Sequence, residues 1–120
     1  MQTARAQRVG ELIKKELSDI IKREIKDPRI GFVTITGVDV SPDLRHADIF
    51  ISVLGSRKAK EATLEGLQSS SGFLRKELSK RIRTKHFPEL KFAFDPSIEA
   101  GMRIEKIIKK LHKKEEETHD

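Results

Sequence analysis

The stretch SSSGFLRKELSKRIRTKHFPELKFAF, residues 69–94, decides the fold. Its first four small residues interrupt a helical pattern, and a new helix follows with Leu74, Leu78 and Ile82 on one side. The Phe-Pro pair closes that helix, because the residue before a proline is pushed out of helical geometry. Residues 90–95 then alternate between apolar and other side chains as a strand does. The stretch therefore predicts a broken helix pair that leads back to a sheet.

The same stretch carries most of the chain's excess positive charge. From Gly72 to Lys91 there are seven basic and two acidic residues, a local charge of +5 in a chain whose net charge is +6. A polyanion selects such a cluster, because each neutralised phosphate releases condensed counterions. The stretch therefore predicts contact with nucleic acid.

Upstream of this stretch, the pattern predicts one helix and a hairpin. Apolar residues recur at three- and four-residue intervals over 9–25, and the proline after Asp27 ends that helix. Residues 31–40 are rich in β-branched side chains, and 47–53 alternate cleanly. The turn at 41–43 joins the two as a hairpin.

The remaining elements complete a two-layer α+β domain. Ser56 is the expected N-cap of a second helix, and Asp95-Pro96 starts a final helix with apolar residues to Leu111. The strand at 90–95 returns after a helical crossover, so we expect it to lie parallel to the second strand. All helices should cover one face of the three-stranded sheet, in a single domain of residues 1–112. Residues 113–120 read as a charged, disordered tail.

Composition argues against several classes of protein. The chain has no cysteine, so it forms no disulfide or thiolate metal site. Its first residues lack the apolar run of a signal peptide, and no stretch is long and apolar enough to span a bilayer. The four histidines are scattered, and no phosphate loop, nucleophile motif or carboxylate pair appears. We expect a soluble cytoplasmic protein that is not an enzyme and has no cofactor.

A family resemblance rests on several short strings in a fixed order. The first six expected elements follow the order of a type II KH domain, and the chain from about Arg5 to Leu111 resembles the bacterial ribosome-binding factor A family. The strings that carry the resemblance are Arg8-Val9-Gly10, Lys26-Asp27-Pro28-Arg29-Ile30-Gly31-Phe32, Ser52-Val53-Leu54-Gly55, Gly72-Phe73-Leu74-Arg75, Phe87-Pro88-Glu89-Leu90-Lys91-Phe92 and Asp95-Pro96-Ser97.

The resemblance implies a KH-like fold and a role in ribosome assembly. It implies a non-enzymatic, monomeric, cytoplasmic factor that binds the small (30S) ribosomal subunit and its 16S rRNA during late maturation and rRNA processing. It also implies a role in cold adaptation and names ribosome-assembly GTPases as candidate partners. In that family a helix–kink–helix element, usually Ala-x-Gly, replaces the Gly-x-x-Gly clamp of ordinary KH domains. Here the kink would be Ser70-Ser71-Gly72, with serine in the place of alanine.

The kink and the helix after it are the first candidate sites. Hydroxyls and amides of Ser70, Ser71 and Gly72 could hold an rRNA backbone at the N-terminus of the third helix. The alternative is a plain bend that lets two helix halves pack. The apolar stripe of the third helix leaves six basic residues to solvent, with Lys76, Lys80 and Arg83 expected on one ridge. The alternative for these is a solvated face. The six are Arg75, Lys76, Lys80, Arg81, Arg83 and Lys85.

Three further arginines and one ring complete the candidates. Arg5 and Arg8 have no acidic residue near them, whereas intrahelical ion pairs account for the later charges of the first helix. Arg45 lies at the hairpin turn and could reach a phosphate; the favoured alternative is an ordinary surface residue. Phe50 faces away from the aliphatic side of its strand and is the one phenylalanine expected to be exposed. The chain has no tyrosine or tryptophan, so we expect recognition of RNA by backbone and shape and not by stacked bases. A rival function is a protein-interaction module whose basic face binds an acidic protein.

Overall fold

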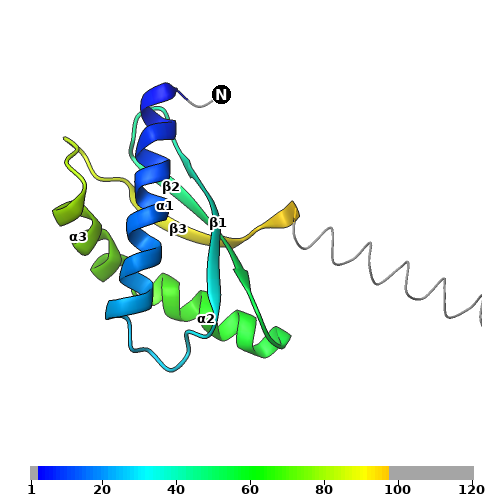
Figure 1. Cartoon of the computed structure of the whole chain (residues 1–120). Coiled ribbons are helices and arrows are strands. Elements are labelled where there is room, and N and C mark those ends of the chain that lie inside the picture. Colours follow the sequence, from blue (N-terminus) through cyan, green and yellow to red (C-terminus); the bar gives the residue numbers. More distant parts are fainter. Residues whose placement is uncertain (1–2, 98–120) are drawn as a thin grey trace, which may run out of the picture.

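The computed structural model describes residues 3–97 of the 120-residue chain. Its elements follow the order helix, strand, strand, helix, helix, strand (Figure 1). This order is the one expected from the sequence. The final helix begins as expected, since Pro96 and Ser97 are helical and the amide of Ser97 donates to Asp95 at 2.9 Å. The continuation of that helix and the charged tail at 113–120 lie outside the described residues.

Helix α1, Ala4–Glu24, is the longest described element. Its N-terminus is capped by Thr3, whose hydroxyl accepts a hydrogen bond from the amide of Ala6 at 3.1 Å. Its apolar stripe, spaced at three and four residues, buries Ile13, Leu17 and Ile20 completely. The helix ends where Ile25 takes an extended conformation, two residues ahead of the Asp-Pro pair.

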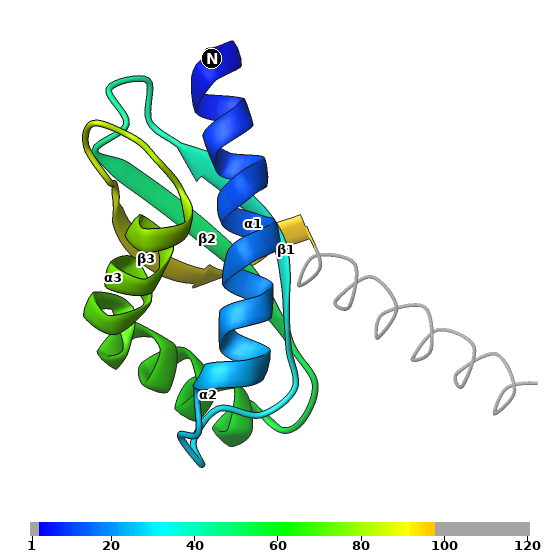
Figure 2. The ribbon, with the colours of Figure 1, turned by 60° about the vertical axis from the view of Figure 1, so that its left-hand side comes forward.

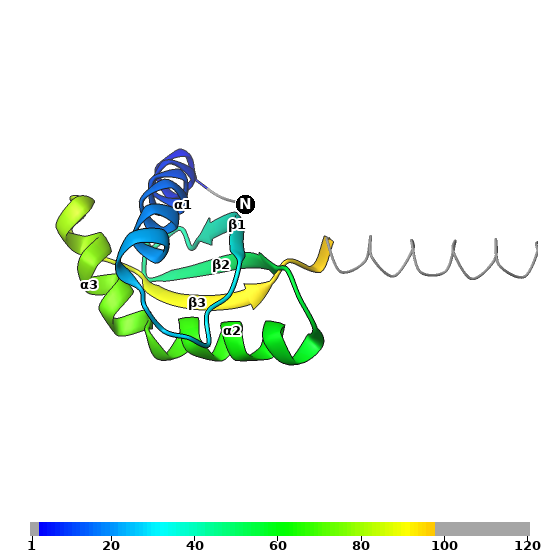
Figure 3. The same ribbon diagram turned by 60° about the horizontal axis from the view of Figure 1, so that its bottom comes forward.

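The sheet has the strand order β1-β2-β3. Strands β1, Val33–Val40, and β2, His46–Val53, are antiparallel, and β3, Glu89–Phe94, lies parallel to β2. Helices α2, Arg57–Ser69, and α3, Ser71–Arg81, form the crossover between β2 and β3. In Figure 3, α2 runs alongside β3. The expected parallel return of the third strand is confirmed.

All three helices pack on one face of the sheet. The buried positions of β2 alternate through Ala47, Ile49, Ile51 and Val53, and each faces an apolar partner across the sheet. The other face of β2 is exposed or half-buried. In Figure 2, α1 and α3 lie side by side in front of the strands. The two-layer α+β architecture expected from the sequence is therefore confirmed.

A β-bulge interrupts the pairing of β1 with β2. Ile35 faces Ile51, but Gly37 faces Phe50, so Thr36 is the extra residue on the β1 side. The Thr36 hydroxyl lies 2.6 Å from a carboxylate oxygen of Asp95 and donates to it. In a regular strand, residues five positions apart point to opposite faces of the sheet. The bulge shifts the alternation of β1 by one residue, so Ile35 and Val40 both point into the core.

Helix α1 lies against the backbone of β1 at a glycine. A Cβ added to Gly10 would stand 2.9 Å from the carbonyl oxygen of Val38 and 3.5 Å from a side-chain carbon of Val40. The absence of a side chain at Gly10 is therefore what allows the helix to pack this closely on the strand. Among residues 3–97, no helix has the length and apolar character needed to cross a membrane.

Candidate nucleic-acid interface

The break between α2 and α3 lies at Ser70, as the sequence predicted. Ser70 has φ −90° and ψ 2°, and its amide donates to the carbonyls of Gly66 and Leu67, both at 3.1 Å. Its side chain makes no capping bond to the first turn of α3. By contrast, Ser56 caps α2 by accepting a hydrogen bond from the amide of Ala59 at 3.2 Å. The amides that open α3 are therefore not covered by a side-chain cap.

Gly72 stands in open space in the first turn of α3. Apart from its chain neighbours and its own helix backbone, no atom lies within 4 Å of the position that a Cβ would take there. Ser70 and Ser71 are half-buried, whereas Gly72 is exposed. Packing within the protein therefore gives no reason for a glycine at this position.

The basic residues of α3 differ in what they contact. Leu74 and Leu78 are fully buried, and the exposed side carries Arg75, Lys76 and Lys80. The guanidinium of Arg75 donates to the carbonyl of Phe87 at 2.8 Å, in the segment that leads to β3. Lys80 pairs with Glu77 at 3.2 Å, and its side chain stays 61% exposed.

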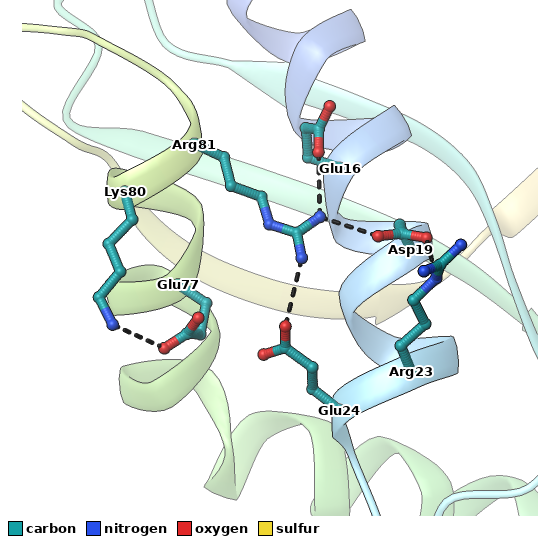
Figure 4. A network of polar contacts seen from close by, with 7 residues as sticks. All are labelled: Glu16, Asp19, Arg23, Glu24, Glu77, Lys80 and Arg81. Atoms are coloured by element: carbon teal, nitrogen blue, oxygen red, sulfur yellow. Dashed lines mark hydrogen bonds and ion pairs between the residues drawn. The ribbon is translucent and has the colours of Figure 1, made fainter.

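Arg81 turns towards α1, and its side chain stays 29% exposed (Figure 4). Its guanidinium lies 3.1 Å from Glu16, 2.9 Å from Asp19 and 3.2 Å from Glu24. The hydrogen bond from Arg81 holds the pKa of Asp19 below its usual value, and the same contacts raise the pKa of Arg81. Because this cation is engaged with three carboxylates, we leave Arg81 out of the interface proposed below.

Replacing Arg81 by glutamine should raise the pKa of Asp19 towards its ordinary value. A folded-state pKa that is lowered gives stability above the unfolded value of about 3.9, and this stability is lost as pH falls through the folded pKa. The stability advantage of the wild-type protein over Arg81→Gln should therefore be complete above about pH 4 and should shrink as pH falls below it. Carboxyl-carbon NMR titration of Asp19 measures the shift directly.

Asp43 provides the internal control for this titration. Its pKa is lowered by the Ser41 hydroxyl and then by the Arg45 amide, neither of which involves Arg81. Asp43 should titrate identically in both proteins. An Asp19 titration that is unchanged by the substitution would show that the Arg81 contact does not exist in solution.

The expected ridge of Lys76, Lys80 and Arg83 is not a continuous helical row. Helix α3 ends at Arg81, and Ile82 takes an extended conformation with φ −118° and ψ 118°. Ile82 is nevertheless buried, so the chain turns there to keep this side chain in the core. Arg83 and Lys85 are exposed in the segment 82–88 that follows the helix.

Arg45 and Arg75 meet in one shallow groove, although they lie thirty positions apart in the sequence. The groove has a volume of about 380 Å³ and is lined by Arg45, His46, Arg75, His86, Phe87 and Glu89. The strand pairing brings them together, since the amide of Glu89 donates to the Arg45 carbonyl at 2.8 Å. The sequence named both arginines as candidates but did not show that they are neighbours.

Arg5 and Arg8 are exposed on the first turns of α1. The start of α1, the turn at 41–45 and the segment 82–88 lie at the same end of the domain (Figure 2). The kink at Ser70 lies at the other end of α3. The candidate residues thus fall into two groups, with Lys76 and Lys80 between them on α3.

The prediction that Phe50 is the exposed phenylalanine is wrong. Phe50 is half-buried, and its ring lies 3.9 Å from where a Cβ of Gly37 would stand. The bulge places this glycine opposite Phe50, so the ring can lie down on the sheet. The exposed rings are those of Phe32, 84% exposed, and Phe73, 47% exposed.

A second groove, between α2 and β3, has the opposite electrostatic character. It has a volume of about 500 Å³ and is lined by Glu61, Leu64, Glu65, Gln68, Ser69 and Phe92. The side-chain oxygen of Gln68 accepts a hydrogen bond from the Phe92 amide at 3.1 Å. Glu61 pairs with Arg57 at 3.3 Å, but that arginine side chain is 94% exposed and therefore strongly screened. Two carboxylates at its rim make this groove a poor place for a phosphate.

Within residues 3–97, no three His, Asp or Glu side chains come close enough together to hold a metal ion. The chemistry that the described residues offer is therefore electrostatic and hydrogen-bonded contact over an exposed basic surface. We define the basic surface as the exposed side of α3 with the segment 82–85 and the arginines of the adjoining groove. Its residues are Arg45, Arg75, Lys76, Lys80, Arg83 and Lys85.

Comparison with known proteins gives a consistent result. A family model described as "Ribosome-binding factor A" matches residues 5–108. A ribosome-binding factor A of Halothermothrix orenii is 51% identical over 120 residues, covering all of this chain and 97% of that relative.

Solved structures show the same fold. The crystal structure of ribosome-binding factor A from Thermus thermophilus superposes with a TM-score of 0.66 at 22% identity, covering 74% of this chain and 94% of that one. A T. thermophilus ribosome binding factor A homology model, fitted into the cryo-EM map of a 30S complex, superposes with a TM-score of 0.62 at 23% identity. That likeness covers 73% of this chain and 92% of the other.

Proposed function

This chain belongs to the ribosome-binding factor A family, and we propose on that premise that it binds the small (30S) ribosomal subunit through its 16S rRNA. It acts during late maturation and rRNA processing, as a cytoplasmic monomer that catalyses no reaction. The cell needs this factor most at low temperature, because misfolded RNA helices rearrange more slowly when chilled. Ribosome-assembly GTPases are the partners expected to act with it.

The observation that carries this proposal is the basic surface. Lys76, Arg83 and Lys85 are exposed on adjoining segments, and the groove beside them adds Arg45 and Arg75. Within residues 3–97, the one ion pair that this surface makes is between Lys80 and Glu77. Cations gathered in this way neutralise several phosphates at once, and the resulting affinity falls steeply with salt. Recognition would depend on the RNA backbone and shape, with the protein holding a junction of rRNA until processing is complete.

The experiment that tests the function is sedimentation of cell extract on a gradient. The protein should migrate with free small subunits, above all with immature ones, and not with translating ribosomes. The alternative of a module for acidic proteins predicts migration at the top of the gradient even at low salt. That result would contradict the proposed function.

The kink offers a separate test at Gly72. Replacing Gly72 by valine should weaken binding to immature small subunits about tenfold, because a side chain there would hold the RNA backbone away from the amides that open α3. Pelleting of subunits with labelled protein measures the affinity. The fold should be unaffected, since the site is open.

Ala59→Val is the matched control, because Ala59 is exposed in the first turn of α2 as Gly72 is in α3. This variant should bind subunits as wild type does. If a folded Gly72→Val protein binds with unchanged affinity, the kink is a bend that serves helix packing alone.

A further inference from the structure

Phe73 is a partly exposed phenylalanine on the most basic of the described helices. Its side chain is 47% exposed and follows Gly72 in the first turn of α3. The chain has no tyrosine and no tryptophan, so only its six phenylalanines can offer a ring to a ligand. Packing within the protein therefore covers only about half of the surface of Phe73.

The position of Phe73 on α3 places it in line with cations. Residues three, four and seven positions further along a helix lie on the same side, which places Lys76, Glu77 and Lys80 on the side of Phe73. Glu77 is half-buried and pairs with Lys80 at 3.2 Å, whereas Lys76 is exposed. The opposite side is taken by Leu74 and Leu78, which are fully buried. The space at Gly72 is open, so a flat group can approach the ring from the direction of the kink.

The other exposed ring has quite different surroundings. Phe32 precedes β1, and its carbonyl accepts a hydrogen bond from the amide of Leu54, another strongly exposed apolar residue. A single exposed apolar side chain requires no explanation by itself. What distinguishes Phe73 is a ring, two lysines and an open backbone on one side of one helix.

We propose that Phe73 stacks on an unpaired base of the bound RNA while Lys76 and Lys80, further along α3, contact phosphates of the adjoining nucleotides. This inference rests on the proposed function and names a class of target, a single-stranded nucleotide at the edge of a structured RNA. Each base has a π-face, so the contact favours unpaired over paired RNA without selecting one base. Losing one such stack should weaken binding roughly 5- to 150-fold.

The first experiment compares four proteins in pelleting assays with immature small subunits. Phe73→Ala and Phe73→Leu should both lose roughly 5- to 150-fold in affinity, whereas Phe73→Tyr, which keeps a ring, should bind as wild type does. Leucine keeps an apolar side chain without a π-face. A leucine variant that binds as well as wild type would overturn the inference, since packing alone would then explain the contact.

The second experiment uses the absence of tryptophan in the chain. Phe73→Trp introduces a single fluorophore, whose emission should be quenched when a short single-stranded RNA is added and much less by a duplex of the same length. Phe32→Trp is the matched control and should report no quenching. RNA that binds, by the anisotropy of a labelled oligonucleotide, without quenching the tryptophan at position 73 would overturn the inference.

The two proposals fail in different ways. Subunits that bind wild type and Phe73→Ala equally would remove the stacking contact and leave the proposed function standing. Wild-type protein that fails to bind subunits at all would overturn the proposed function and, with it, the role of Phe73.

Discussion

Replacing Lys76, Arg83 and Lys85 together by glutamate should lower the affinity for immature small subunits on the order of a thousand-fold, about one power of ten per contact. All three side chains are exposed, so the fold should survive the change. The slope of log affinity against log salt concentration should become shallower by about three units, one for each lost phosphate contact. Pelleting of subunits over a series of potassium chloride concentrations measures both quantities.

A second triple reversal separates local contact from overall charge. Lys22, Lys26 and Lys58 are also exposed, and reversing them likewise lowers the formal net charge from +6 to 0. They lie on α1, the segment after it and the first turn of α2, and none of them belongs to the basic surface. This control should keep most of the affinity and most of the salt slope. Equal losses in the two variants would mean that the basic surface has no special part in binding.

Replacing Gly10 by valine should destabilise the protein by about 3 kcal/mol, the upper part of the usual range for overpacking. The nearest atom to the new Cβ would be the Val38 carbonyl oxygen at 2.9 Å, and a backbone atom in a sheet cannot move aside cheaply. Glycine and valine differ by only a few tenths of a kcal/mol in helix propensity, so propensity does not offset the clash. Urea denaturation followed by circular dichroism gives the free energy of unfolding.

Gly72→Val is the control for this substitution, because it makes the same change in another helix at an open position. Its free energy of unfolding should lie within about 0.5 kcal/mol of wild type. A Gly10→Val protein as stable as this control would show that α1 does not pack on β1 as closely as described.

Local sequence patterns were enough to predict most of the fold. The apolar stripe over residues 9–25 specified α1, the alternation from Ala47 to Val53 specified β2, and Ser56 capped α2 as expected. The rule for crossover connections gave the parallel direction of β3. The first three features depend on residues close together in the chain, and the direction of β3 follows from the helical connection between the two strands.

Features that depend on distant residues were not predicted. The bulge at Thr36 is accompanied by a hydrogen bond to Asp95, fifty-nine positions away. The direction of Arg81 depends on carboxylates of α1, which the sequence pattern assigned to intrahelical pairs. Of those pairs, Asp19 with Arg23 does form, at 2.9 Å. Glu16 and Asp19 lie three positions apart on one side of α1. This spacing was the one signal in the sequence that a cation from another element would lie between them.

The acidic groove between α2 and β3 has a consequence for the kinetics of association. Opposite charges on adjoining sides give the molecule a preferred orientation as it nears a polyanion, because the side with Glu61 and Glu65 is repelled while the α3 side is attracted. At physiological ionic strength the Debye length is about 8 Å, close to the width of a helix. The orienting force therefore acts only in the last stage of approach. There it raises the fraction of collisions in which the α3 side meets the polyanion first.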